Sequence, residues 1–522
     1  MRKLIVKGQE ITAVKITAGA SPAEQYAASE LAKYLDRIAG IGSDGTYPVK
    51  IALDGSIDRD GYRICVCEEC GLSVCGGNGR GVIYGVYAFL EKYAGVRFFM
   101  PGLEVYGDGD IIVDEGFAFT PVFEYRQSDW PCGGDIDWSV KNGVNNRPIP
   151  EEMGGAVAYG GFVHTMAALT GADQFREQPC LSDPENLKKA IAGVRKILSE
   201  NPGVTIVSVS QNDNQHYCKC EKCAAVDAEE GSHMGTLLRF VNAVADDIRE
   251  DYPHVIVDTL AYQYTRNVPK ITKPRENVCI RLCSIECCFS HPLNDRSCGV
   301  NSKFYDDILD WNKICDRIYI WDYVTDFSHY IPPFPNFAVL RENMRFFADH
   351  GVRGMYPEGN YNSAASGEFG ELRCYLLAKL MMDPYMSTVD YYRLMDEFLA
   401  AYYGAGWRTI RAFIDYTCAE AAGTHMSIWA PAFSIIPEEK YAAMESTIDG
   451  WWDNAEALAG DRLEYVKRSR MQWRYIKLML HPDAEEGKKF LDDVQKYNIK
   501  WNEWKTLPEN PDFSKKPVEW LG

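Results

Sequence analysis

The 522-residue sequence has no apolar run long enough to cross a membrane and no excess of positive charge. A membrane helix needs about 18 or more consecutive apolar residues. The first residues, MRKLIVKGQEITAVKI, alternate like a strand and do not form the apolar core of a signal peptide. Lys and Arg number 55 against 74 Asp and Glu, which gives a net charge of −19. Because nucleic acid requires a basic surface, we expect neither a nucleic-acid nor a membrane partner, and we expect a cytoplasmic location.

Several catalytic motifs are also missing. The sequence contains no HExxH metal motif, and no Ser or Cys stands in a nucleophile elbow. The Gly-rich segment 76–81, GGNGRG, is not followed by the Lys-Ser/Thr pair of a phosphate loop, so we expect a tight turn that leads into a helix. No organic cofactor is indicated. Acid/base chemistry by paired carboxylates is left as the main enzymatic option.

The chain is long enough for several domains, and its texture changes twice. Residues 1–120 have the pattern of an α/β accessory domain. Residues 121–370 alternate apolar strands with amphipathic helices, which predicts a (β/α)₈ TIM barrel. Residues 371–522 are rich in Trp and Tyr and predict a helical C-terminal region.

Local signals place individual elements within these parts. In the first part, Ser21 is expected to cap a helix that begins at Pro22 and ends at Gly40, and strands are expected near 48–53 and 61–66. The predicted barrel strands are 122–128, 143–147, 159–165, 205–211, 255–262, 278–285, 317–323 and 351–356. The second and third of these have the weakest patterns.

Carboxylates follow four of the predicted barrel strands. In a (β/α)₈ barrel the chemistry lies at the carboxyl ends of the strands. Asp213, Glu286, Asp322 and Glu358 end the fourth, sixth, seventh and eighth strands. Glycoside hydrolysis needs such groups, because one carboxylic acid protonates the leaving oxygen while a carboxylate attacks or activates water. A single strand-end acid more often caps a helix or pairs with Arg, but four at one end of a barrel favour catalysis.

Polar and aromatic side chains at the same strand ends predict a carbohydrate-binding surface. Aromatic rings suit the apolar C–H face of a sugar, and amides suit its hydroxyl groups. The predicted substrate-binding residues are Trp130, Arg126, Asn146, His164, Asn212, Tyr262, Tyr264, Trp321, Tyr323 and Asn360. A structural role is an equal alternative for His164, and pairing with a nearby acid is an equal alternative for Arg126.

The 17 cysteines fall into two groups. Most lie in apolar, strand-like runs and are expected to be reduced, buried thiols. Cys218, Cys220 and Cys223 instead have a spacing suited to tetrahedral Zn²⁺, and Cys-rich sites are closed and structural. We therefore expect a structural zinc that fixes the loop after the fourth strand; free thiols or a disulfide are the alternatives. The candidates for the fourth ligand are Cys180, His216, His233 and Cys283.

Several segments between residues 160 and 385 resemble a bacterial family catalogued as domain of unknown function 4838. They include GGFVHTMAAL, SVSQNDNQHYCKCEKCAAVDAEEGS, TLAYQYTRNVPK, IWDYVTDFSHYIPPFPNF and GEFGELRCYLLAKLMMDP. A further segment, GRGVIYGVYAFLEKYAGVRFFMPG, resembles the end of the accessory domain that precedes the barrel in family 67 α-glucuronidases and family 20 hexosaminidases. The resemblance implies a glycosidase scaffold and does not name a sugar.

The resemblance also implies roles for particular positions. Asp213 matches the strand-four general acid, but Asn212 stands where family 20 has a second acid, which disfavours cleavage of N-acetyl sugars. Glu286 and Asp322 resemble the two acids that activate water in family 67, an arrangement that implies inversion. Near Glu358 the sequence departs from the pattern, since Pro357 occupies the position where an acid is expected.

The sequence thus predicts a glycoside hydrolase that acts on small oligosaccharides or glycosides, with an inverting, α-glucuronidase-like enzyme as one option. Asp213 is the predicted acid, and Glu286, alone or with Asp322, is the predicted base. Two alternatives remain open. One is a catalytically silent carbohydrate-binding protein on the same scaffold, and the other is a metal-dependent hydrolase that reacts at the cysteine cluster. A homo-oligomer is compatible with the sequence.

Overall fold

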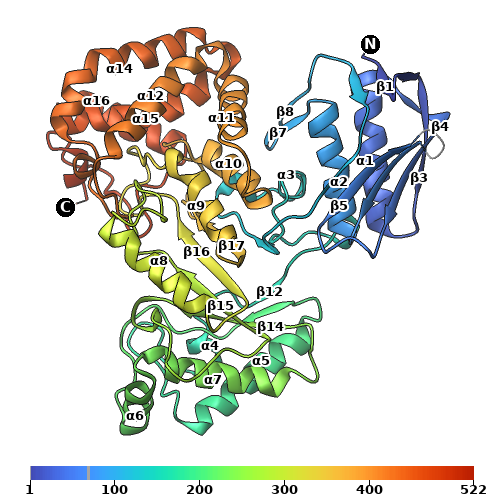
Figure 1. Cartoon of the computed structure of the whole chain (residues 1–522). Helices are drawn as coiled ribbons and strands as arrows, with labels where there is room; N and C mark the ends of the chain where they lie inside the picture. Colours follow the sequence, from blue (N-terminus) through green and yellow to red (C-terminus); the bar gives the residue numbers. More distant parts are fainter. Residues whose placement is uncertain (1, 68–70, 522) are drawn as a thin grey trace. The chain divides into compact units, whose positions relative to one another are not determined.

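The computed structural model describes residues 2–67 and 71–521, and the chain divides into two compact units. The first unit comprises the N-terminal region up to Ala156, the segment Val324–Arg341 and the chain from Glu358 onward. The second comprises Val157–Tyr323 and Glu342–Pro357. Figure 1 shows helices and strands in both. Among the described residues, no helix has the length and apolar character that spanning a membrane requires.

The N-terminal part of the first unit is a five-stranded sheet with two helices packed on it (Figure 1). The sheet has the order β10-β5-β6-β4-β3. Its strands are β3 (Ala13–Ala18), β4 (Gly42–Leu53), β5 (Tyr62–Cys67), β6 (Gly71–Gly76) and β10 (Phe117–Phe119). The shorter strands of this part are β1 (Leu4–Val6), β2 (Gln9–Ile11), β7 (Arg97–Met100), β8 (Leu103–Val105) and β9 (Ile111–Val113).

The two helices begin and end where the sequence predicts. In α1 (Pro22–Ala39), the hydroxyl of Ser21 accepts from the N–H of Glu24, and Gly40 closes the helix at φ +64°. The Gly-rich turn leads into α2 (Gly79–Tyr93), whose first turn is capped by Asn78. The predicted turn and both helices are therefore confirmed.

The second unit contains a parallel sheet curved into part of a barrel, with helices between its strands (Figure 1). Six strands follow one another in the order β17-β16-β15-β14-β13-β12. They are β12 (Tyr159–Gly160), β13 (Ile206–Ser208), β14 (Ile256–Ala261), β15 (Val278–Cys283), β16 (Ile318–Tyr323) and β17 (Val352–Glu358). The helices after them are α4 (Met166–Thr170), α5 (Pro184–Glu200), α6 (Glu221–Glu230), α7 (His233–Ile248), α8 (Gly299–Asn312) and α9 (Phe337–Asp349). The mixed α/β class is confirmed, whereas closure into eight strands remains a prediction.

The first three predicted barrel strands need correction. Residues 143–147 form no strand, because Gly143 has φ +76° and the side chain of Asn145 accepts from the N–H of Arg126 in place of a ladder partner. Of 122–128, only β11 (Tyr125–Arg126) is a strand. Of 159–165, only β12 is, since Val163 and His164 have positive φ values that end an extended chain.

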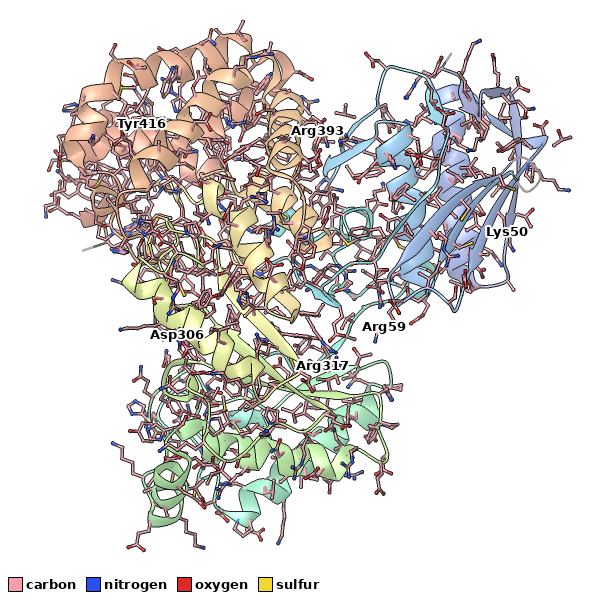
Figure 2. All side chains as sticks on the ribbon, viewed as in Figure 1. Lys50, Arg59, Asp306, Arg317, Arg393 and Tyr416 are labelled. Atoms are coloured by element: carbon pink, nitrogen blue, oxygen red, sulfur yellow. The ribbon has the colours of Figure 1, made fainter. Side chains whose placement is uncertain are left out.

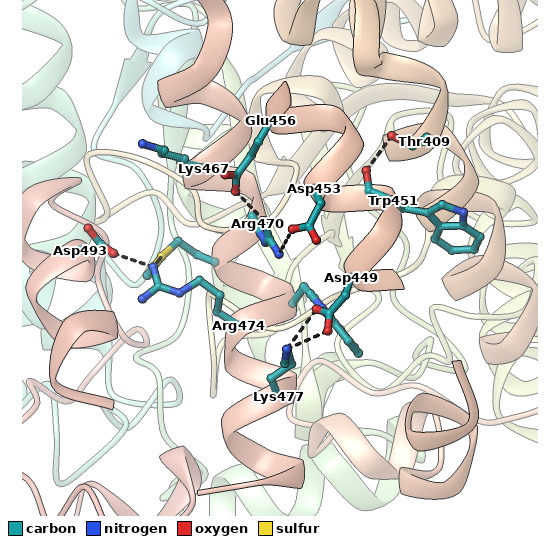
Figure 3. Close-up of polar contacts among 12 residues, drawn as sticks. Thr409, Asp449, Trp451, Asp453, Glu456, Lys467, Arg470, Arg474, Lys477 and Asp493 are labelled. Atoms are coloured by element: carbon teal, nitrogen blue, oxygen red, sulfur yellow. Dashed lines mark hydrogen bonds and ion pairs between the residues drawn. The ribbon is translucent and has the colours of Figure 1, made fainter. Parts of the chain in front are cut away.

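The C-terminal part of the first unit is helical, as its aromatic sequence predicts. Its helices are α10 (Gly370–Met382), α11 (Thr388–Tyr403), α12 (Trp407–Ala421), α13 (Ala432–Ile435), α14 (Glu438–Leu458), α15 (Leu463–Leu480) and α16 (Ala484–Lys496). Buried Trp452 and Trp473 pack between them. Arg470 of α15 pairs with Asp453 and Glu456 of α14 at 2.8 Å (Figure 3). Ion pairs therefore flank an aromatic core.

Candidate active site and metal cluster

The carboxyl end of β16 presents an aromatic face in the second unit. Side chains alternate along a strand, so Tyr319, Trp321 and Tyr323 share one face. The ring centroid of Trp321 lies 4.8 Å from that of Tyr356 and 5.8 Å from that of Phe162. Tyr323 stacks on Trp321 at 6.2 Å. This face includes two of the predicted binding residues, Trp321 and Tyr323, and both are buried, with 8% and 5% of their surface exposed.

Asp322 lies on the opposite face of β16 and is buried, with 3% of its surface exposed. Its Oδ1 accepts a hydrogen bond of 2.7 Å from the hydroxyl of Ser284. Burial raises the pKa of Asp322 to about 6, because removal from water disfavours the charged form. Asp322 can therefore carry a proton close to neutral pH, as a general acid must.

Asp213 has the contrasting environment. It follows β13, is exposed to solvent, and accepts a 3.1 Å hydrogen bond from the hydroxyl of Tyr262. Burial, together with the charge of Asp213, raises the pKa of Tyr262, so this phenol remains a hydrogen-bond donor. Asp213 is thus placed as a solvent-accessible carboxylate that a phenol orients.

His164 links these two regions. Its ring lies 6.2 Å from that of Tyr262 and 6.4 Å from that of Trp321. Nδ1 lies 2.7 Å from the carbonyl oxygen of Gln211, which can only accept, so Nδ1 carries the proton and Nε2 is left for another partner. His164 has φ +52°, an unfavourable conformation for a non-glycine residue that the surrounding structure must enforce.

Two predicted binding residues of the second unit have structural partners. Asn212 is buried, its Oδ1 accepts from the N–H of Ala167, and its Nδ2 donates to the carbonyl of Glu177. Tyr264 stacks on Tyr217 at 5.2 Å, away from β16 and next to the cysteine cluster described below. Asn212 thereby fixes the loop that carries Asp213.

Glu286 is about half exposed and forms an ion pair of 2.9 Å with Arg266. The guanidinium of Arg266 also contacts Asp307 of α8. This arrangement corresponds to the structural alternative for a strand-end acid, although the exposed carboxylate remains accessible to a ligand.

The remaining predicted site residues belong to the first unit. Trp130 and Asn360 are buried, and the Trp130 Nε1 and Asn360 Oδ1 atoms have no hydrogen-bond partner among the described residues. The same holds for Oδ1 of Asn146. Buried polar atoms normally have partners, so these three atoms are suited to bind a polar ligand or ordered water.

Glu358 ends β17 in an acidic environment that the sequence analysis missed. Burial, followed by the charges of Glu503, Glu358 and Asp129, raises the pKa of Tyr361 to about 12. Asp129 and Glu503 were not predicted as site residues, although Asp129 directly follows the predicted strand 122–128. Their proximity to Glu358 depends on the fold, although Asp129 directly precedes the predicted Trp130.

Arg126 has a structural environment in the first unit. It is fully buried and pairs with Asp60 at 2.9 Å, and it also donates to the carbonyl oxygens of Gly143 and Phe123. The predicted substrate contact would require Arg126 to leave these partners. Arg126 therefore pairs with an acid, which is the structural alternative that was expected for it.

Four cysteines gather after β13. Cys218, Cys220 and Cys223 are joined by Cys180, with all four sulfur atoms within 4.8 Å of one another. Cys180 Sγ lies 3.7 Å from Cys220 Sγ and 3.8 Å from Cys223 Sγ. A tetrahedral ion with metal–sulfur bonds of about 2.3 Å separates its ligands by about 3.8 Å. This cluster, hereafter the Cys180 cluster, has the ligands and spacing to hold a metal ion.

Local contacts stabilise the Cys180 cluster, and two of the other candidates for its fourth ligand have different surroundings. Cys220 caps α6, where its sulfur accepts from the N–H of Cys223, a contact that lowers the pKa of Cys220 to about 7. Of the other candidates for the fourth position, His233 bonds Asp227 at 2.6 Å and Cys283 lies in β15. Elsewhere, Cys67 is disulfide-bonded, which corrects the expectation that the strand cysteines are all reduced.

Comparison with family models identifies the family of the chain. Residues 108–415 match the model described as "Domain of unknown function (DUF4838)", which covers more than half of the sequence. The chain belongs to this family, and the predicted resemblance is confirmed. Among curated proteins, no match was found.

Solved structures with a similar fold are glycoside hydrolases. One is BtGH115A, a family GH115 4-O-methyl-α-glucuronidase with specificity for decorated arabinogalactans: TM-score 0.57, 11% identity, covering 99% of this chain and 80% of that chain. The family 89 enzyme CpGH89 of Clostridium perfringens has TM-score 0.48 and 12% identity, covering 91% and 64%. A β-hexosaminidase of Streptomyces plicatus has TM-score 0.45 and 12% identity, covering 77% and 92%. At such identities the likeness concerns the fold alone, and only the GH115 structure supports an inference.

Proposed function

We propose that the protein is a glycoside hydrolase that cleaves small oligosaccharides or glycosides with carboxyl groups as acid and base. The glycosidase-like fold supports this class of reaction, but fold alone does not define a function. Support for the function must therefore come from the side chains at the ends of the strands of the second unit.

The observation that carries the proposal is the contrast between two carboxyl groups. Asp322 is buried with a pKa raised to about 6, whereas Asp213 is exposed and oriented by Tyr262. An acid/base pair requires one group that keeps its proton and another that does not, and different environments provide this difference.

The roles follow from these environments. The sequence assigned the acid to Asp213, a role that requires a raised pKa. Burial supports Asp322 as the proton donor instead, and the exposed Asp213, oriented by Tyr262, is its proposed partner. Glu286, paired with Arg266, is a second candidate base, and Glu358 of the first unit remains a further catalytic candidate.

A uronic acid glycoside is the first substrate class to test. The similar GH115 enzyme is a 4-O-methyl-α-glucuronidase, and Asn212, where family 20 has a second acid, disfavours N-acetyl sugars. The stereochemical outcome, proposed to be inversion, depends on a carboxyl separation of roughly 6.5–9.5 Å in the substrate complex.

We also propose a structural Zn²⁺ in the Cys180 cluster. Four thiolates complete a tetrahedral shell and leave no open position for water, so the cluster is unsuited to be a hydrolytic metal centre. The metal-dependent hydrolase is therefore the weaker alternative. By fixing the loop after β13, the ion would help to position Asp213.

The test is turnover of a panel of aryl glycosides and aryl uronides by the wild type, Asp213→Asn and Asp246→Asn. We expect the wild type to turn over at least one uronide or glycoside, and Asp213→Asn to lose about 100-fold or more in kcat/KM. Asp246 is a matched control, because it pairs with Arg275 on the exposed side of α7. Full activity of Asp213→Asn would refute the role of Asp213.

A catalytically silent sugar-binding protein is the second candidate. The unpartnered polar atoms of Trp130, Asn146 and Asn360 favour it, since they suit hydroxyl ligands without requiring an acid. Calorimetry with the sugars of the same panel distinguishes the two: heat of binding without turnover by the wild type would establish a binding protein.

A further inference from the structure

The loop between β15 and α8 carries Glu286 and, directly after it, a second set of metal-ligand side chains. Cys288, His291 and Cys298 place their ligand atoms within 4.8 Å of one another. The Cys288 Sγ and His291 Nδ1 atoms are 3.2 Å apart. Both cysteines are buried, and His291 is partly exposed. Neither the spacing in the sequence nor any family resemblance pointed to this set, because ten residues separate Cys288 from Cys298.

The ligand types and distances suit zinc. Sulfur and imidazole nitrogen are the donors that Zn²⁺ prefers in proteins. With Zn–S bonds of about 2.3 Å and Zn–N bonds of about 2.0–2.1 Å, a tetrahedral site places sulfur and nitrogen about 3.6 Å apart. The observed contact can reach this value through a small rotation of either side chain.

The backbone around these ligands is held in advance of metal binding. Asn301 of α8 is fully buried, and its Nδ2 donates to the carbonyl oxygens of Cys288 and His291 at 3.0 Å. Its Oδ1 accepts from the N–H of Cys288 at 2.8 Å. One amide side chain thus fixes the residues that bear two of the three ligands, and a fixed backbone lowers the entropy cost of binding an ion.

The third ligand is positioned by a helix. Cys298 is the N-cap of α8. Further along α8, Asp306, labelled in Figure 2, pairs with Arg296 of the same loop at 2.7 Å. In the Cys180 cluster, Cys220 likewise caps a helix.

We propose that Cys288, His291 and Cys298 bind a Zn²⁺ ion that fixes the β15–α8 loop and thereby Glu286. The fourth position is left to a solvent molecule or to a side chain outside this loop. The protein would then hold two zinc ions, each in a loop that carries a strand-end carboxylate. Asp213 precedes Cys218 by five residues, and Glu286 precedes Cys288 by two. The zinc assignment does not require the protein to be a glycosidase.

The first test is the zinc content of the full chain, purified after expression with added ZnCl₂ and measured by mass spectrometry. We expect about two ions per wild-type chain, and about one in Cys288→Ser/Cys298→Ser and in Cys218→Ser/Cys223→Ser. Cys65→Ser, which changes a free thiol outside both clusters, is the control and should keep two. The proposal would be overturned if the wild type held one zinc ion and Cys288→Ser/Cys298→Ser held the same ion.

A second measurement needs no variant and is therefore independent of misfolding. X-ray absorption at the zinc edge reports the average ligand set of the bound ions. One four-sulfur site and one site with two sulfurs average three sulfurs and one nitrogen or oxygen. Four sulfurs on average would mean that only the Cys180 cluster is filled, and Cys288 and His291 would then be a hydrogen-bonded thiol–imidazole pair. Because neither experiment uses a substrate, their outcome is separate from that of the glycosidase test.

Discussion

At the scale of single residues, burial rather than position in the sequence distinguishes the candidate carboxylates. In the sequence, Asp213 and Glu286 follow apolar runs and Asp322 lies near the end of one, and this position does not show how deeply each side chain is buried. In the folded chain Asp322 lies behind the aromatic face of β16, Asp213 reaches solvent, and Glu286 faces Arg266. The raised pKa of Asp322 therefore depends on burial by distant parts of the chain, which the hydrogen bond from Ser284, far away in the sequence, only partly opposes.

The raised pKa of Asp322 predicts a specific dependence of stability on pH. A carboxyl group whose folded-state pKa is about 6, above its usual 3.8, contributes stability at low pH that is lost as the pH rises through 6. The shift of about two units corresponds to about 3 kcal/mol. The melting temperature of Asp322→Asn minus that of the wild type should therefore increase by several degrees when the pH is raised from 4 to 8. Scanning calorimetry tests this; Asp246→Asn is the control, and an equal difference for Asp322→Asn at both pH values would contradict the raised pKa.

At the scale of elements, the sequence predicts those whose signals are local. The capping box at Ser21, the αL glycine at Gly40 and the long apolar strands β14 to β16 all appear where expected. The wrong predictions concern segments whose structure depends on contacts with distant residues. For example, residues 143–147 form no strand, and the side chain of Asn145 bonds to the backbone of Arg126 and Glu124. The sequence could not show which of the four candidates is the fourth ligand of the cluster, since Cys180 lies 38 positions before Cys218.

One buried acid connects α6 to the segment that follows β14, and it predicts an effect on stability. Glu230 is fully buried, and it accepts from the N–H groups of Ile271 and Thr272 and from Arg239. Burial alone would raise its pKa, but the hydroxyl and N–H of Thr272 and the other donors lower it to about 2. A lowered folded-state pKa contributes stability above about pH 4.5, the usual value, and this contribution is lost as the pH falls toward 2.

Glu230→Gln should therefore destabilise the second unit by about 1–3 kcal/mol at pH 7, because the amide leaves buried donors poorly paired. The difference from the wild type should shrink in acid. Glu229→Gln is a matched control, since Glu229 is exposed and pairs with the same Arg239. Melting temperatures at pH 7 and pH 4 give the comparison; equal effects of the two substitutions would show that the contacts of Glu230 do not stabilise the fold.

At the scale of the whole molecule, the sequence predicts the class of fold and the family. It does not predict the substrate, because the residues that would bind it come from distant parts of the sequence. Within the second unit, two loops each carry a strand-end carboxylate next to a Cys or Cys/His cluster. Small shifts of a carboxylate cost large factors in rate, so fixing these loops would serve the proposed catalysis. Substitutions that remove either proposed zinc ion should therefore reduce the proposed activity.

The central proposal is that Asp322 donates the proton to the leaving oxygen. The most direct test is kcat/KM of the wild type and Asp322→Asn on two aryl glycosides of the same sugar, one with a poor leaving group and one with 2,4-dinitrophenolate, which needs no protonation. We predict a loss of about 10²–10⁴-fold on the poor leaving group and nearly unchanged activity on the dinitrophenyl glycoside. An equal loss on both substrates, or no loss on either, would contradict this role of Asp322.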